Sequence, residues 1–214
     1  MNKKAQVTIF IILSLIIIVV VGGYFTFKNV VKTKQNAFDV FEIQTFVKNC
    51  VEKKAEPIIL QISENGGYYL LSNFSTFSGI PIYYSNNKFY TPSLEEIENE
   101  ISNNLKKQLL NCTDDFKAFE EFQIVQEIPY ILTEIKEDKI LIDVYYPLKI
   151  SKENSVVELE DFGTFNFNIP LGKIYYSVLN FLEVSNFDFG TCLSCIFDIS
   201  VKDKMKINMF NYND

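Results

Sequence analysis

The strongest hydrophobic feature of the chain is an uninterrupted apolar run from Val7 to Phe27, in which no residue is charged. At about 1.5 Å of helical rise per residue the run spans roughly 30 Å, the thickness of a bilayer's hydrocarbon core. It follows a short basic start, Met1–Lys4, and no A-x-A-like cleavage site follows it. We therefore predict that residues 1–35 form a transmembrane anchor in contact with the lipid bilayer.

The orientation of this anchor does not follow from charge alone, because lysines flank the run on both sides. Two other features favour a cytoplasmic N-terminus and an outer body. The first helix follows a basic start, and the body contains four cysteines. We expect a single-pass protein of the cell membrane whose C-terminal domain, residues 36–214, is extracytoplasmic.

Helical periodicity dominates the first part of the body. Apolar residues recur at helical spacing from Phe38 to Val51, with charged residues between them. They predict an amphipathic stalk helix over 36–63 that extends the membrane helix. Pro57 is expected to kink this helix, and Gly66-Gly67 is expected to end it.

Two further helices are expected. Ser93 and Glu96 form a capping-box pattern, which predicts a helix from this point to Cys112. The spacing of apolar residues over 171–182 predicts another helix. The apolar stripe of the first of these helices consists of Leu94, Ile97, Ile101, Leu105 and Leu109.

Strand-like segments alternate with turn signals elsewhere in the body. Residues 85–87 and 136–139 are expected to form hairpin turns, and Pro147 is expected to bend the strand pairing or end it. This order of elements predicts an α+β fold: a compact domain with an antiparallel β-sheet and two or three helices. The predicted strands cover 68–71, 80–84, 88–90, 122–128, 130–135, 140–146, 156–159, 164–169, 196–201 and 205–210.

Charge and composition exclude several functions. All 27 acidic residues follow residue 35, so the body is strongly acidic and unsuited to nucleic acid, whose phosphates require clustered lysine or arginine. The chain contains no histidine, which removes the usual general base and the usual zinc nitrogen ligand. The acidic pairs, such as Glu95-Glu96, are interpreted as a solvated surface. We expect neither catalysis nor a cofactor.

The cysteines Cys50, Cys112, Cys192 and Cys195 are disulfide candidates in an exported chain. Three pairings are open, and the simplest to picture joins Cys50 to Cys112 and Cys192 to Cys195. The alternative is four reduced thiols in the core. A redox-active C-x-x-C normally begins a helix, whereas residues 196–201 are expected to form a strand. A zinc site would require all four cysteines to come together.

Two N-x-[ST] patterns are candidates for N-glycosylation, at Asn73 and at Asn111. Asn73 is expected in a loop. Asn111 is expected at a helix end, beside a cysteine.

The opening Lys3–Ile12 resembles that of many uncharacterised archaeal membrane proteins of DPANN-type lineages. Later segments fit this resemblance: Cys50 in a helix ending at Gly66–Tyr68, Pro92–Glu96 before a helix that closes on Cys112, and Tyr146-Pro-Leu148 after a β-hairpin. The resemblance implies an exported, single-pass, extracytoplasmic protein with no assigned activity.

The same opening is similar to a type IV pilin-like (class III) signal. In that family a cut follows a basic stretch and a small residue, and the apolar helix stays on the mature protein as its assembly core. In this chain the cut would fall between Ala5 and Gln6. Two departures from the pattern are Ala5, where glycine is commonest, and Phe10, where many pilins carry glutamate.

The preferred hypothesis is a membrane-anchored extracytoplasmic protein with a structural or interaction role at an archaeal cell surface, with protein partners or self-association. One alternative is a pilin-like filament subunit processed between Ala5 and Gln6. Another is a thiol-redox or zinc-binding protein that uses Cys192 and Cys195.

Overall fold

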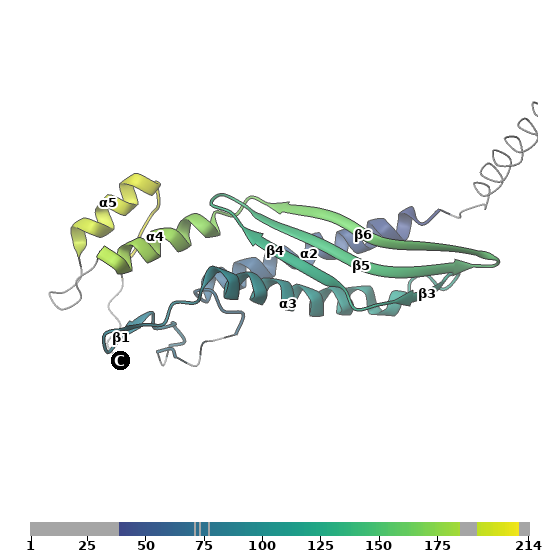
Figure 1. The fold of residues 1–214 in the computed structure, drawn as a ribbon, viewed down its shortest axis with the longest axis horizontal. Coiled ribbons are helices and arrows are strands. Elements are labelled where there is room, and N and C mark those ends of the chain that lie inside the picture. The colour runs from purple at the N-terminus through teal and green to yellow at the C-terminus, as the bar shows by residue number, and fades with distance from the viewer. Residues whose placement is uncertain (1–38, 71, 73, 77, 185–191, 210–214) are drawn as a thin grey trace, which may run out of the picture.

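The computed structural model describes residues 39–209 except 71, 73, 77 and 185–191, and it shows an α+β fold with antiparallel sheets (Figure 1). This confirms the predicted fold class in its coarse form. The described residues contain four α-helices, one at the position of the predicted stalk helix and three others, where two or three were expected. The predicted membrane segment Val7–Phe27, with Ala5 and Gln6 before it, lies outside the described residues. Among the helices that the structure describes, none has the length and apolar character needed to cross a bilayer.

The first described helix, α2, runs from Phe41 to Glu64 and confirms the predicted amphipathic helix from residue 41 onward. The helix continues through Pro57 and ends where Gly66 and Gly67 adopt positive φ angles of 63° and 96°. The Gly67 N–H then donates to the Ile62 carbonyl oxygen at 2.8 Å. Glycine permits this left-handed backbone without a Cβ penalty. The buried face of α2 consists of Ile43, Val47, Cys50, Val51, Ala55, Ile58, Ile59 and Ile62.

Helix α3, Leu94–Thr113, begins at the predicted capping box. The Ser93 hydroxyl accepts a hydrogen bond from the Glu96 N–H at 3.2 Å, and the Glu96 carboxylate accepts one from the Ser93 N–H at 2.7 Å. The backbone hydrogen bond from Ser93 is the main reason that the pKa of Glu96 lies below its usual value. The predicted stripe from Ile97 to Leu109 is buried.

Four strands form the main sheet: β3 Gln123–Gln126, β4 Tyr130–Ile135, β5 Ile140–Lys152 and β6 Ser155–Phe167. Strand β5 is central. It pairs with β6 on one side, and on the other side with β4 along its first half and with β3 along its second half. All three pairings are antiparallel. The predicted turn 136–139 joins β4 to β5 and is closed by the Lys136 N–H, which donates to the Lys139 carbonyl oxygen at 2.8 Å.

Pro147 does not end β5, which continues to Lys152. The pairing of β5 with β6 is irregular on both sides of Tyr145, and the second shift leaves Pro147 without a partner in β6. Proline has no N–H to donate to a sheet, so a bulge at this position is the expected accommodation. On its other side, the Pro147 carbonyl oxygen accepts a hydrogen bond from the Glu127 N–H at 3.0 Å.

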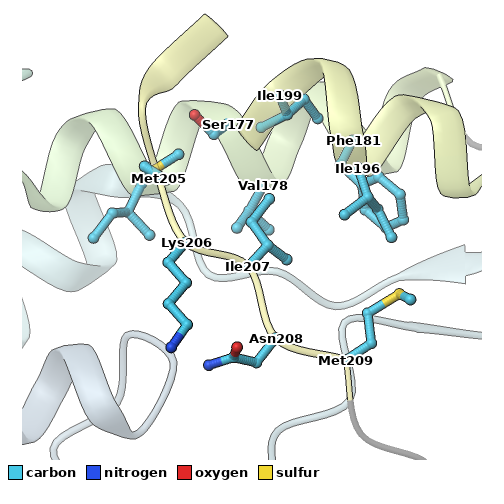
Figure 2. A pocket seen from close by; sticks show the side chains of 11 residues that line it. Ser177, Val178, Phe181, Ile196, Ile199, Met205, Lys206, Ile207, Asn208 and Met209 are labelled. Carbon is cyan, nitrogen blue, oxygen red and sulfur yellow. The ribbon is translucent and has the colours of Figure 1, made fainter. Parts of the chain in front are cut away.

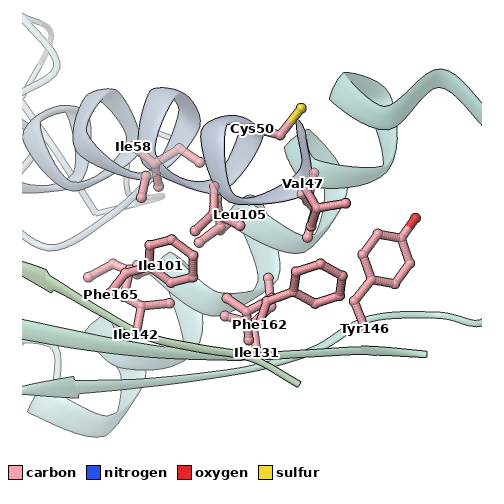
Figure 3. Packing of buried hydrophobic residues seen from close by; sticks show 14 of the residues in the cluster. Val47, Cys50, Ile58, Ile101, Leu105, Ile131, Ile142, Tyr146, Phe162 and Phe165 are labelled. Atoms are coloured by element: carbon pink, nitrogen blue, oxygen red, sulfur yellow. The ribbon is translucent and has the colours of Figure 1, made fainter. Parts of the chain in front are cut away.

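Helices α2 and α3 cover one face of this sheet (Figure 1). The facing side of β5 alternates strictly, and Ile140, Ile142, Val144, Tyr146, Leu148 and Ile150 are all buried. Figure 3 shows side chains of α2 and α3 facing those of the sheet, with Val47 of α2 next to Phe162 and Tyr146. Because the opposite face of the sheet carries exposed side chains, the architecture has two layers.

Several predicted strands are corrected by the structure. Tyr68–Leu70 does not form a strand, because side-chain amides of Gln61 and Asn65 bind the Tyr69 carbonyl oxygen in place of a partner strand. The predicted hairpin is shorter than expected, with β1 Tyr84–Ser85 and β2 Lys88–Phe89 around Asn86 and Asn87, both at positive φ.

The predictions at the C-terminal end are also corrected. Residues 196–201 belong to a helix, and 205–209 have no strand pairing. Conversely, the predicted helix 171–182 is confirmed as α4, Leu171–Val184, which leads to α5, Leu193–Asp203.

Candidate functional site

The α4–α5 pair lies beyond the end of the main sheet that carries the β4–β5 turn (Figure 1). A close backbone approach fixes this position. A Cβ atom at Gly172 would lie 2.3 Å from the Lys136 carbonyl oxygen, so only glycine fits there. The next residue, Lys173, donates its N–H to the Glu137 carbonyl oxygen at 3.0 Å. The start of α4 is therefore anchored to the turn between β4 and β5.

A hydrogen bond between side chains joins α5 to α4. Ser177 is 8% exposed, and its hydroxyl lies 2.6 Å from a carboxylate oxygen of Asp203 at the end of α5. The same hydroxyl lies 2.9 Å from the Lys173 carbonyl oxygen. Immediately after α5, Lys204 adopts a left-handed backbone with φ of 54°. The chain turns there, and residues 205–209 pass back across α4 and α5 (Figure 2).

The two helices and the returning segment enclose an apolar groove of about 820 Å³, which we call the α4–α5 groove. Figure 2 shows its side chains converging from α4, from α5 and from residues 205–209. A pocket of this size with few polar groups is typical of a binding site. The lining consists of Ile174, Ser177, Val178, Phe181, Ile196, Ile199, Met205, Lys206, Ile207, Asn208 and Met209.

The outer side of α5 is apolar as well. Leu193, Phe197 and Val201 recur every four residues, so they share one side of the helix, and they are 62%, 67% and 61% exposed. We call these three residues the outer α5 face. Contiguous exposed apolar surface of this kind marks interaction sites in soluble domains.

The Cys192–Cys195 pair lies at the start of α5 and is bridged by a disulfide, with Cα atoms 5.3 Å apart. Cys192 is the N-cap residue of the helix, and its Sγ accepts a hydrogen bond from the Cys195 N–H at 3.2 Å. Residues 196–201, directly after this pair, were expected to form a strand, and that expectation argued against a redox-active C-x-x-C. The expectation was wrong, because Cys195 lies in the first turn of a helix.

The second bridge, Cys50–Cys112, joins α2 to α3 with Cα atoms 5.9 Å apart. The structure therefore has the pairing that was simplest to picture. The alternative of four free thiols is wrong, because no cysteine is free. Every cysteine is engaged in a disulfide, so none is present as a thiolate ligand for zinc. Within the described residues, no group of three or more histidine, cysteine or acidic side chains is placed to hold a metal ion.

The two glycosylation candidates differ in their setting. Asn73 lies outside the described residues. Asn111 is exposed on α3, but the Thr113 of its motif is buried. The Thr113 hydroxyl donates to the Leu110 carbonyl oxygen at 3.1 Å and lies 3.3 Å from the Tyr146 hydroxyl. In the folded protein the Thr113 hydroxyl, which a glycosylating enzyme must recognise, is therefore buried and hydrogen-bonded in the core.

The fold and the site together define a class: a disulfide-stabilised α+β domain with an apolar helical pair at one end of its sheet. Comparisons with family models, with curated proteins and with solved structures each find no match. The assignment of function therefore rests on the residues themselves.

Sequence reasoning missed α5 and, with it, the groove. The sequence does contain a signal for this helix, because the apolar residues at 193, 196, 197 and 201 follow helical spacing directly after Cys192. The groove itself needs three segments that only the folded chain brings together.

Proposed function

We propose that the chain is a membrane-anchored, extracytoplasmic protein with an interaction role at the cell surface. The observation that carries this proposal is the Cys50–Cys112 bridge. Cys50 is 3% exposed and belongs to the main core. Disulfides persist in oxidising compartments and are rare in the cytosol. The uncharged run Val7–Phe27 supplies the expected contact with the bilayer.

The α4–α5 groove and the outer α5 face are the surfaces through which such a protein would bind a partner protein or a second copy of itself. Both are apolar, whereas the chain as a whole carries a net charge of −7. An acidic surface keeps the domain soluble and away from anionic lipid. Association is therefore expected to occur through this end of the domain.

Membrane orientation can be tested with the full chain in intact cells from which the outer envelope has been removed. A protease added outside should degrade residues 36–214. A thiol reagent added after denaturation should label neither Cys50 nor Cys112 unless the sample is first reduced. A protected body in which Cys50 and Cys112 react without prior reduction would overturn the proposal. A cytosolic marker protein in the same cells controls for leakage.

A pilin-like subunit processed between Ala5 and Gln6 is the second candidate. One observation favours it: α2, the first described helix after the apolar run, packs against both α3 and β6 and is bridged to α3. A filament subunit needs the helix that follows its assembly segment to be firmly held in its domain. The intact mass of the protein isolated from membranes separates the candidates, because processing would remove Met1–Ala5.

A further inference from the structure

The two disulfides of the chain lie in opposite environments. Cys50–Cys112 spans two helices, and Cys50 is buried in the main core. Cys192–Cys195 is a local bridge of two half-buried residues, with a sequence separation of 3, at the beginning of a helix of 11 residues. A bridge between residues this close together constrains little of the unfolded chain, so stabilisation gives a weak reason for its presence.

The surroundings of Cys192 favour a thiolate at this position once the bridge is opened. Its Sγ accepts the Cys195 N–H at 3.2 Å and lies 3.5 Å from the Ser194 hydroxyl. The N-terminus of α5 adds a partial positive charge, and no acidic residue lies in the first turn of α5 to oppose it. A thiolate stabilised in this way is both a selective nucleophile and a good leaving group in thiol–disulfide exchange.

We propose that Cys192–Cys195 is an exchange-active disulfide that accepts two electrons from a dithiol on a partner polypeptide. A partner thiolate attacks the Cys192 Sγ, the Cys192–Cys195 bond breaks, and Cys195 leaves and takes up a proton. The second partner thiolate then attacks the partner sulfur of this mixed disulfide and expels Cys192 as a thiolate. The partner loses two electrons and two protons and gains a disulfide. The chain retains the dithiol.

Recognition of the partner is assigned to the apolar side chains next to the bridge. Leu193 directly follows Cys192, and Phe197 lies one helical turn further along the same side of α5. Both project from the helix into solvent. A thiol carried by an apolar peptide would therefore dock here, whereas a small hydrophilic thiol would gain nothing from these contacts. This inference goes beyond the proposed function and does not depend on the orientation of the membrane anchor.

Single-cysteine variants test the chemistry in the purified full-length protein held in lipid nanodiscs. Cys195→Ser leaves Cys192 as the one thiol of the pair. Given the peptide in its disulfide form, the Cys192 thiolate should attack a peptide sulfur, expel the other peptide sulfur as a thiolate and hold the peptide as a mixed disulfide, because Cys195 is not there to resolve it. Cys192→Ser keeps a good N-cap residue, so the helix start is preserved while the proposed nucleophile is lost. The probe is a synthetic apolar peptide with two thiols, mixed in its reduced form with the oxidised wild-type protein. The products are identified by alkylation and mass spectrometry.

The expected result has three parts. The peptide becomes oxidised as Cys192–Cys195 opens, while Cys50–Cys112 in the same molecule stays closed. In the reduced protein at about pH 6, alkylation of Cys192 exceeds that of Cys195 by about tenfold or more. When the peptide is supplied in its disulfide form, Cys195→Ser forms a mixed disulfide with it, and Cys192→Ser does not. Equal alkylation of the two cysteines, or a bridge that survives the peptide dithiol as long as Cys50–Cys112 does, would overturn the proposal.

Phe197→Ser tests the recognition step separately. This variant should slow exchange with the apolar dithiol peptide by about fivefold and leave exchange with glutathione unchanged, because Phe197 contributes contact area and not chemistry. Phe89→Ser, at an exposed aromatic residue in β2, is the matched control and should change neither rate. If Phe197→Ser slows both thiols equally, the outer α5 face does not select the partner.

Discussion

The Ser177 hydroxyl of α4 donates a hydrogen bond of 2.6 Å to the Asp203 carboxylate, 26 residues further along the chain, and this bond holds the end of α5 against α4. Ser177 is buried and Asp203 is half-buried. A hydrogen bond to a charged group in such a place is worth about 1.5–3 kcal/mol. The bond therefore contributes substantially to the shape of the α4–α5 groove.

Ser177→Ala is expected to loosen α5 without unfolding the domain. The variant removes the only hydroxyl that the structure gives to Asp203 among the described residues, and leaves a partly buried carboxylate to be solvated. Hydrogen exchange of the α5 amides should accelerate by about tenfold or more, while the amides of β5 should be unchanged. Ser85→Ala, at a serine of β1 outside α4 and α5, is the control. Equal protection of α5 in wild type and Ser177→Ala would show that apolar packing alone holds the helix.

The two disulfides should contribute unequally to stability. Removing Cys50–Cys112, with a sequence separation of 62, by alanine at both positions should cost about 4 kcal/mol on the loop-entropy relation. Removing Cys192–Cys195 by serine at both positions should cost about 2 kcal/mol or less on the same relation. Urea unfolding followed by circular dichroism measures both. If both double variants lost the same free energy of unfolding, Cys192–Cys195 would be a stabilising bridge like Cys50–Cys112, which would contradict this prediction.

Gly172→Ala is expected to destabilise the protein because the new Cβ would meet the Lys136 carbonyl oxygen at 2.3 Å. Overpacking against backbone of this kind costs about 1–3 kcal/mol. Gly163→Ala is the informative comparison, since its Cβ would meet nothing within 4 Å and only the φ of 85° is unfavourable. Gly172→Ala should also lower the protection of the α4 amides, whereas Gly163→Ala should not. The opposite pattern would mean that α4 is not anchored at the β4–β5 turn.

Tyr83 should make the folded protein sensitive to alkaline pH. Burial, with smaller contributions from Tyr68 and Tyr175, raises the pKa of Tyr83 to about 12. The unfolded chain releases this proton near the usual value of 10.0, so the unfolded state binds fewer protons above that pH and the stability falls as the pH rises. The loss begins near pH 10, levels off near pH 12, and amounts to about 2 kcal/mol after allowance for partial exposure.

Tyr83→Phe checks this assignment. The variant lacks the hydroxyl that donates to the Gly66 carbonyl oxygen at 2.6 Å, so it should be less stable by about 1 kcal/mol at neutral pH. Its stability should then depend less on pH between about 10 and 12. Tyr84→Phe, at the neighbouring residue in β1, serves as the control. An unchanged alkaline profile in Tyr83→Phe would place the titration on another tyrosine.

The sequence predicted the elements whose local signals agree with their tertiary contacts. The capping box at Ser93 set the start of α3, and the helical spacing of Ile97 and Ile101 set its buried face. The strands 130–135 and 140–146 with the turn 136–139 between them were also predicted, and β4 and β5 pair there. Of the three pairings left open, the simplest joined Cys50 to Cys112, and the structure has this bridge.

The sequence misled where tertiary contacts override local preference. Ile196, Ile199 and Val201 are β-branched and suggest a strand, but Cys192 caps a helix and Ile199 is buried against α4. The single strand β6 was predicted as two strands, 156–159 and 164–169. Its buried residues Phe162 and Phe165 lie three positions apart, which does not fit the two-residue period of a regular strand. The irregular pairing near Gly163 with β5 causes this spacing, and no period-two pattern reveals it.

The groove can be tested before any natural ligand is identified. Anilinonaphthalene sulfonate fluoresces in apolar sites, and Lys206 in the lining complements its sulfonate. We expect the full chain in nanodiscs to increase the dye fluorescence above that of empty nanodiscs. Ile207→Asp should reduce this increase by about fivefold or more, because the carboxylate places an unpaired charge against the apolar wall. Ile207 is partly exposed, so the variant should still fold.

Leu132→Asp is the matched control, because Leu132 is an exposed apolar residue of similar size on the outer face of the main sheet, away from the groove lining. It should leave the dye signal unchanged. If both variants reduce the signal equally, the dye reports general apolar surface and the α4–α5 groove is not a distinct site. If only Ile207→Asp reduces the signal, the α4–α5 groove is a distinct apolar site that is open to solvent. A partner's apolar side chain could then bind in it, because an apolar lining that disfavours a carboxylate favours an apolar group.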